Sequence, residues 1–173
     1  DTVAIVDLEE VLEADNPYVP SDLHGSRKPL VETADALLID LDGVCYAGTR
    51  DIPNAAAGLA AARQSGIKFQ FLTNNASRTP EQVAEKLKGH GIEADPAEVM
   101  TAAMDAVEIL TQKIEPESKV LVIGTQALID TVAQAGFEVV SKASEQPVAV
   151  IQGYGPEVGW KQLSEAAYAI NDG

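Results

Sequence analysis

The sequence predicts an α/β fold with a mainly parallel β-sheet. From residue 35 onward, short apolar runs alternate with longer segments that have helical spacing and helical end signals. The apolar runs have the length of strands and little internal polarity, which is typical of strands covered on both faces. Strands that alternate with helices in this way indicate a parallel sheet with helical crossovers.

The apolar runs are expected to be strands, and the segments between them helices. The expected strands cover residues 36–42, 67–75, 98–102, 119–125 and 147–154. The expected helices cover residues 54–66, 79–91, 102–113, 125–137 and 159–173.

Helix start and stop signals support this division. In the second helix Thr79 is a candidate N-cap, Pro80 lies in the first turn, and Gln82 completes a capping box. Asn54 is a candidate N-cap for the first helix, and Gly66 is its expected stop. These signals fix where the predicted helices begin and end.

The last two helices have apolar residues at helical spacing. In the helix at 125–137, Leu128, Ile129 and Val132 share one face, and Gly136 is the expected stop. The helix at 159–173 has a corresponding stripe, which is expected to pack against the fold. Its members are Trp160, Leu163, Ala167 and Ile170.

Composition excludes some classes of partner. The chain of 173 residues has a net charge of −15, which argues against a nucleic-acid or anionic-membrane partner, because both require a basic surface. Cys45 is the only cysteine, so an internal disulfide is impossible and a reducing cytoplasm is the expected location. No apolar stretch approaches the roughly 20 residues that span a bilayer.

Two of the expected strands end in polar clusters. The strand at 36–42 ends in Asp40-Leu41-Asp42 before Gly43, and the strand at 67–75 ends in Thr73-Asn74-Asn75. If these strands are neighbours, both clusters lie at the carboxyl edge of the sheet, where ligands bind in such folds. One alternative is that the aspartates only cap the next turn and that the second cluster is an ordinary loop.

The residue types in these clusters fit a phosphate and a divalent cation. Asp40 and Asp42 can reach one small volume, where two carboxylates require a cation or a shared proton. Mg²⁺ prefers carboxylate oxygens and keeps water and phosphate ligands. Gly43 permits a tight turn that exposes backbone N–H groups, while Thr73 and Asn74 offer a hydroxyl and an amide.

The strings "DLDGV" and "TNNASR" resemble the first two motifs of the haloacid dehalogenase superfamily. More narrowly, the sequence from Ala36 onward is similar to NagD-like phosphatases with a large inserted cap, and in particular to actinobacterial enzymes acting on glycerol 3-phosphate. The resemblance implies a Rossmann-like core sheet with an inserted α/β cap domain. It divides the chain into an acidic extension at 1–34, the first part of the core at 35–114 and the first part of the cap at 115–173.

The resemblance also implies a reaction and its residues. The enzyme would be a Mg²⁺-dependent phosphatase of small phosphorylated metabolites, working through an aspartyl-phosphate. Asp40 would be the nucleophile, Asp42 the acid and base, and both would hold the metal, Asp42 through its main-chain carbonyl. Gly43, Thr73 and Asn74 would bind the phosphate. Members of the family often dimerise through the cap, so the resemblance leaves open whether this protein forms a homo-oligomer.

Two motifs of the family are missing from the sequence. These are a lysine in a "GKP" string and a Gly-Asp segment that completes the metal site. We therefore expect the sequence to be an N-terminal portion of a longer phosphatase, with an incomplete cap. If it is the whole chain, we expect little activity, and the alternative is an inactive relative that binds a phosphometabolite or a protein.

Other reactive or aromatic residues are expected to be structural. Cys45 has no histidine near it in sequence, so it is interpreted as a packed residue and not a nucleophile. His90 is expected to be a surface residue, and Trp160 and Tyr168 to take part in helix packing. Residues 1–34, with the short apolar run "VAIV", are interpreted as an arm on the main fold or, equally, as a disordered tail.

Overall fold

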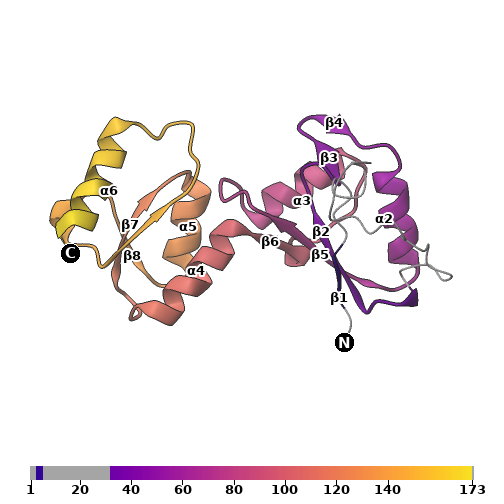
Figure 1. The fold of residues 1–173 in the computed structure, drawn as a ribbon, viewed down its shortest axis with the longest axis horizontal. Helices are drawn as coiled ribbons and strands as arrows, with labels where there is room; N and C mark the ends of the chain where they lie inside the picture. The colour runs from indigo at the N-terminus through magenta and orange to yellow at the C-terminus, as the bar shows by residue number, and fades with distance from the viewer. Residues whose placement is uncertain (1–2, 6–31, 173) are drawn as a thin grey trace, which may run out of the picture. The chain divides into compact units, whose positions relative to one another are not determined.

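The computed structural model describes residues 3–5 and 32–172 (Figure 1). It is a mixed α/β structure with parallel sheets, as the sequence predicts. The chain divides into two compact units. The first unit comprises Asp1–Thr73 and Val83–Val99, and the second comprises Asn74–Gln82 and Met100–Gly173. The domain boundaries expected at residues 34 and 114 stay predictions, and most of the expected extension at 1–34 lies outside the described residues.

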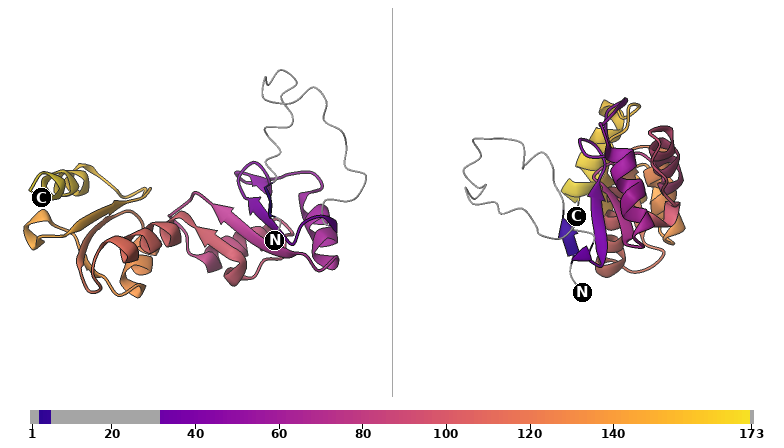
Figure 2. Two further views of the ribbon diagram at one scale, coloured as in Figure 1. Left: turned by 60° about the horizontal axis from the view of Figure 1, so that its bottom comes forward. Right: turned by 90° about the vertical axis from the view of Figure 1, so that its right-hand side faces the viewer.

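The sheet that begins in the first unit has the strand order β1-β2-β5-β6. Strands β2 and β5 lie side by side in parallel, with Asp40 paired to Leu72 at the end of β2 (Figures 1 and 2). Strand β1, part of the "VAIV" run, pairs in parallel with the other edge of β2. The strands are β1 (Val3–Ile5), β2 (Ala36–Asp40), β5 (Lys68–Thr73) and β6 (Val99–Thr101).

Helices and a small hairpin complete this part of the fold. Two short antiparallel strands form the hairpin, which the sequence did not predict. The elements are β3 (Tyr46–Ala47), β4 (Arg50–Asp51), α2 (Ala55–Gln64), α3 (Pro80–Gly89) and the 3₁₀ helix η2 (Pro96–Glu98). Phe71, Leu41 and Leu87 are fully buried in the core of the first unit, where apolar burial stabilises the fold.

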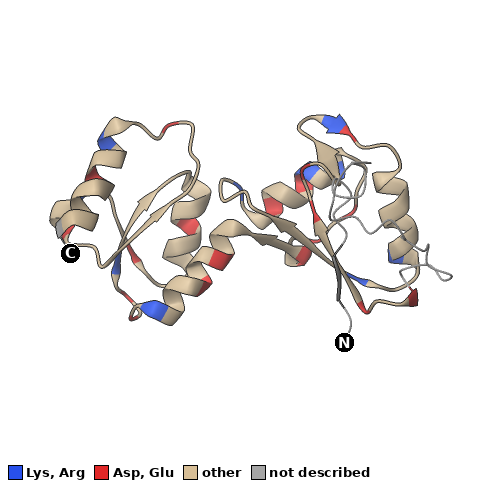
Figure 3. Cartoon of the chain, viewed as in Figure 1, with Lys and Arg blue, Asp and Glu red and all other residues tan. Residues whose placement is uncertain are grey.

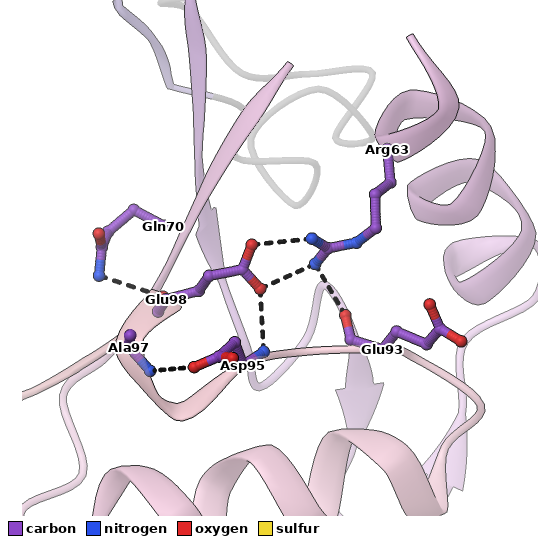
Figure 4. Close-up of polar contacts among 6 residues, drawn as sticks. All are labelled: Arg63, Gln70, Glu93, Asp95, Ala97 and Glu98. Atoms are coloured by element: carbon purple, nitrogen blue, oxygen red, sulfur yellow. Dashed lines mark hydrogen bonds and ion pairs between the residues drawn. The ribbon is translucent and has the colours of Figure 1, made fainter. Parts of the chain in front are cut away.

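An ion-pair network joins separate segments of the first unit (Figure 4). Arg63 at the end of α2 donates two hydrogen bonds to the Glu98 carboxylate, at 2.8 and 2.9 Å, and one to the main-chain oxygen of Glu93. The Glu98 carboxylate also accepts from the Asp95 N–H at 3.0 Å, which makes η2 a capped turn. Gln70 of β5 donates to the main-chain oxygen of Glu98. The network therefore ties α2 and β5 to the turn before β6.

The second unit contains its own parallel sheet, with the strand order β8-β7-β9. Leu128 and Val132 of α5 are buried against this sheet and Ile129 is partly buried, as their spacing predicts. The elements are α4 (Ala102–Lys113), β7 (Lys119–Ile123), α5 (Gln126–Gln134), β8 (Glu138–Val140), the 3₁₀ helix η3 (Ala143–Glu145), β9 (Ala149–Gln152) and α6 (Trp160–Asp172).

The expected position of the α2 N-cap is confirmed, whereas the expected packing of α6 is wrong. Asn54 is the N-cap of α2, but its φ of 68° is left-handed and its side chain makes no capping bond. The predicted packing stripe of α6 faces largely outward, because Trp160 is 84% and Ile170 69% exposed, while Ala166 is the buried residue. Tyr168 is 62% exposed, so it too does not pack as expected.

The surface is acidic, in keeping with the net charge of −15. Figure 3 shows acidic residues on helices and loops of both units, with fewer basic residues among them. Within the described part of the chain, no helix combines the length and the apolar character needed to cross a bilayer.

Candidate active site

Asp40 and Thr73 lie at the carboxyl ends of neighbouring strands. Asp40 is the last residue of β2, and its parallel partner Leu72 precedes Thr73, the last residue of β5. The prediction that these two strands are neighbours is confirmed. Since ligands bind outside the carboxyl ends of strands in parallel sheets, this edge is the candidate active site.

A tight turn after β2 returns the chain to the end of that strand. The main-chain oxygen of the buried Leu41 accepts hydrogen bonds from the N–H groups of Val44, Cys45 and Tyr46, at 3.3, 2.8 and 3.2 Å. Gly43 has a φ of 94°, a conformation that other residues rarely adopt, and its N–H donates to the Tyr46 oxygen at 2.7 Å. The glycine after the two aspartates is therefore required by the turn.

The Asp42 side chain is held by the β3–β4 hairpin. Gly48, between the two short strands, donates its N–H to Asp42 Oδ1 at 3.1 Å. Asp42 also forms an isolated β-bridge with Tyr46. The hydrogen bond from Gly48 orients the carboxylate through Oδ1. Because the residue is exposed, the carboxylate is also open to solvent. A carboxylate in this arrangement can donate or accept a proton at a bound ligand.

The Asp40 carboxylate is exposed at the end of β2. Its main-chain oxygen accepts a hydrogen bond from the Cys45 thiol at 3.4 Å. Burial, and to a smaller extent the negative charge of Asp40, raises the pKa of Cys45 to about 12. The thiol is thus protonated at neutral pH, and Cys45 is a packed residue, as predicted, and not a nucleophile.

The segment after β5 carries the remaining candidate residues. Thr73 closes the strand in the first unit, and Asn74 is the first residue of the second unit. Asn75 Oδ1 accepts hydrogen bonds from the N–H and the hydroxyl of Ser77, at 2.7 and 2.6 Å, which forms a local turn. Asn74 is exposed, and its side chain is a candidate ligand for an anion.

A divalent cation fits the chemistry of these residues. The Asp40 carboxylate makes no hydrogen bond or ion pair with any other described residue, so its oxygens are available as ligands. Among the residues that the structure describes, no group of three or more His, Cys, Asp or Glu side chains is arranged to hold a metal. The available Asp40 carboxylate is compatible with Mg²⁺, because Mg²⁺ is commonly bound by one or two carboxylates together with water and substrate phosphate.

Sequence reasoning missed a cluster of side chains that supports the turn. The His90 ring stacks on Tyr46 with 4.9 Å between ring centroids, and His90 Nδ1 lies 2.6 Å from Asp51 Oδ1. Lys86 Nζ lies over the Tyr46 ring, 3.5 Å from its centroid, and forms a cation–π contact. The His90 side chain is 11% exposed, so the expectation of a surface residue is wrong. No sequence pattern indicates a contact across 39 residues.

Comparisons with known proteins agree on one group of relatives. A sequence model of haloacid dehalogenase-like hydrolases matches residues 37–138. The D-glycerol 3-phosphate phosphatase of Mycobacterium tuberculosis is 38% identical over 146 residues, which cover 84% of this chain and 40% of that protein. This chain therefore spans less than half of that relative.

Solved structures show the same likeness. The crystal structure of glycerol phosphate phosphatase from Mycobacterium tuberculosis in complex with magnesium has a TM-score of 0.80 and 38% identity, over 84% of this chain and 44% of that chain. NagD from Escherichia coli has a TM-score of 0.72 and 28% identity, over 80% of this chain and 54% of that chain.

Proposed function

Because the chain belongs to the haloacid dehalogenase-like hydrolase family, we propose that the protein is a Mg²⁺-dependent phosphatase of small phosphorylated metabolites. The observation that carries the proposal is the placement of Asp40 and Asp42 at the end of β2, beside the end of β5. The named activity of the matched glycerol 3-phosphate phosphatase supports the same reaction.

In the proposed reaction Asp40 is the nucleophile. A carboxylate oxygen of Asp40 attacks phosphorus, the bond from phosphorus to the ester oxygen breaks, and an aspartyl-phosphate forms. Asp42 donates its proton to the departing alkoxide and then accepts a proton from the water that hydrolyses the aspartyl-phosphate. The hydrogen bond from Gly48 to Asp42 Oδ1 supports this role, because it orients the carboxylate and leaves Oδ2 for the substrate.

The phosphate would be held by the ends of the two strands. The turn at Gly43 leaves room for the phosphoryl group, and Thr73 and Asn74 would donate hydrogen bonds to its oxygens. Bound Mg²⁺ would be held by the Asp40 carboxylate and the Asp42 carbonyl and would neutralise charge on the phosphate. This neutralisation has particular value here, since a protein of net charge −15 repels an anionic ester.

The alternative is a binding module that holds a phosphometabolite or a protein without turnover. The cytoplasmic location and a homo-oligomeric state stay predictions in either case.

The test is hydrolysis of glycerol 3-phosphate and other small phosphomonoesters with and without Mg²⁺. We expect turnover that requires Mg²⁺ and falls at least about a thousandfold in Asp40→Asn, because the nucleophile is lost. Asp42→Asn should lose turnover but still accept a phosphoryl group from an activated ester. Asp105→Asn, in the first turn of α4, is the matched control and should leave the rate unchanged. Turnover that survives in Asp40→Asn would overturn the mechanism, and binding without turnover would establish the alternative.

A further inference from the structure

The β3–β4 hairpin carries the hydrogen-bond donor that orients Asp42. Gly48 lies between the two strands, and its N–H donates to Asp42 Oδ1 at 3.1 Å. Each strand has only two residues, with Tyr46 opposite Asp51, and the residues of β4 are exposed. Because a two-stranded hairpin alone is only marginally stable in water, this hairpin needs a contact with the rest of the first unit to keep its position.

One side chain from outside the hairpin contacts both strands. The His90 ring stacks on Tyr46 of β3 with 4.9 Å between ring centroids, and His90 Nδ1 lies 2.6 Å from Oδ1 of Asp51 in β4. Because a carboxylate only accepts hydrogen bonds, the imidazole donates through Nδ1. Tyr46 and Asp51 are register partners, so His90 holds the two strands together at one position of the hairpin.

His90 is itself fixed by the end of α3, within the first unit (Figure 1). It directly follows this helix, and its N–H donates to the main-chain oxygen of Leu87 at 2.9 Å. Leu87 is fully buried in the core. Lys86, one turn earlier, contacts the same Tyr46 ring that His90 stacks on. The hairpin therefore rests on a rigid helix end, which is the support that a precisely placed functional group requires.

The same hairpin holds the main chain at Asp42. The main-chain oxygen of Tyr46 accepts a hydrogen bond from the Gly43 N–H at 2.7 Å, and Tyr46 forms a β-bridge with Asp42. The Asp42 main chain is thus held at Tyr46, and its side chain is held at Gly48, two residues further along. Both contacts come from the hairpin that His90 supports.

We propose that His90 is a positioning residue, which keeps the Gly48 N–H on the Asp42 carboxylate by holding the β3–β4 hairpin. The proposal rests on the proposed function, in which Asp42 gives a proton to the departing oxygen. Proton transfer requires donor and acceptor atoms within hydrogen-bond reach, and a misplacement of about 1 Å can slow a reaction on the order of a hundredfold. Loss of the His90 contact should therefore slow a step that needs the acid and spare a step that does not.

Hydrogen exchange at Gly48 tests the hold on Asp42 without turnover. Exchange of the Gly48 amide with water is measured by NMR in the ¹⁵N-labelled wild type, His90→Phe and Asp51→Ala. Both variants should fold, because His90→Phe keeps a ring on Tyr46 and Asp51 is exposed. We expect exchange about three- to tenfold faster in each variant, as for the loss of one hydrogen bond. The double variant should show no further increase, since both replacements break the same contact.

A second measurement compares two esters whose leaving groups differ in their need for an acid. Glycerol 3-phosphate expels a basic alkoxide that must be protonated, whereas dinitrophenyl phosphate expels a stable phenolate. Release of the leaving group is followed in a single turnover with Mg²⁺. We expect His90→Phe to slow release from glycerol 3-phosphate about tenfold and to leave release from the aryl ester unchanged. A residue that only stabilises the fold would not distinguish the two esters.

The matched control is an exposed residue of the same helix. Glu85→Gln removes an ion pair with Lys88, in which both side chains are more than 70% exposed. This variant should change neither the exchange of the Gly48 amide nor the release from either ester.

The outcomes separate the two proposals. Unchanged exchange at Gly48 in His90→Phe and Asp51→Ala would overturn the positioning role. Equal slowing of both esters in His90→Phe would also overturn it, because loss of the acid affects only the basic leaving group. A wild type that hydrolyses neither ester would overturn the proposed function, and faster or unchanged exchange at Gly48 would then still support or overturn the hold of His90 on Asp42.

Discussion

The Cys45 thiol donates a hydrogen bond to the main-chain oxygen of Asp40, with 3.4 Å between Sγ and the oxygen. Cys45, in the turn after β2, thus contacts Asp40, the proposed nucleophile at the end of β2. Cys45 is 1% exposed, and burial, aided by the charge of Asp40, raises its pKa to about 12. Cys45 therefore stabilises the turn through burial and this hydrogen bond, and its thiol is protonated and unreactive at neutral pH.

Cys45 should therefore resist alkylation in the folded protein. A thiol with a pKa near 12 is almost entirely protonated at pH 8, whereas a thiol with the ordinary pKa of 9.0, as in the unfolded chain, is roughly one tenth thiolate. We expect iodoacetamide to modify the native protein at least about a hundredfold more slowly than the urea-unfolded protein, as measured by intact mass against time. Equal rates in the two states would contradict the placement of Cys45 in the core.

The Arg63–Glu98 pair should make the free energy of unfolding depend on pH. The hydrogen bonds from Arg63 are the largest cause of the lowered pKa of Glu98, so folding favours the ionised carboxylate. The stabilisation is fully present above the unfolded pKa of about 4.5 and is lost as the pH falls through the lower folded value. Glu98→Gln should reduce the unfolding free energy by about 1 kcal/mol at pH 7, and the difference should shrink below pH 4.

Urea unfolding at several pH values measures this effect. The control is Glu85→Gln, which removes an exposed pair with Lys88 at 3.8 Å and should change stability by less than about 0.5 kcal/mol. A Glu98→Gln variant as stable as the wild type at pH 7 would show that the network in Figure 4 does not stabilise the first unit.

The stack of His90 on Tyr46 should stabilise the turn after Asp42. His90→Ala removes a nearly buried ring and its contact with Asp51, and we expect a loss of about 1–3 kcal/mol in unfolding free energy. His90→Phe keeps the stack and loses only the contact with Asp51, so it should recover most of the stability. An Ala variant as stable as the wild type in urea unfolding would show that the ring contact is not stabilising.

Much of the fold could be predicted because its signals are local. The capping box of α3 is present, with Thr79 accepting from the Gln82 N–H and the Gln82 side chain accepting from the Thr79 N–H. The stops at Gly66 and Gly136 follow the ends of α2 and α5. The family resemblance from "DLDGV" and "TNNASR" is confirmed by the match over residues 37–138 and by the likeness to NagD.

Other features could not be predicted because they depend on tertiary contacts. The β3–β4 hairpin has two residues in each strand, and β8 has three, which is too short for a periodic pattern. The apolar spacing of α6 predicted a buried face, yet Ala166 packs inward and Trp160 does not. In the site, the closeness of Asp40 to Thr73 followed from strand order, whereas the His90 cluster joins residues far apart in sequence.

The most direct test of the central claim is to trap the phosphoryl group on Asp40. The protein is incubated with Mg²⁺ and a small phosphate ester, quenched, reduced with borohydride and analysed by peptide mass spectrometry. Reduction converts an aspartyl-phosphate to homoserine, and we predict homoserine at position 40 in the wild type and none in Asp40→Asn. With an activated ester, whose leaving group needs no protonation, Asp42→Asn should slow hydrolysis of the intermediate and is expected to increase the yield. An unmodified Asp40 together with ester turnover, or homoserine at another aspartate, would contradict the assignment of Asp40 as the nucleophile.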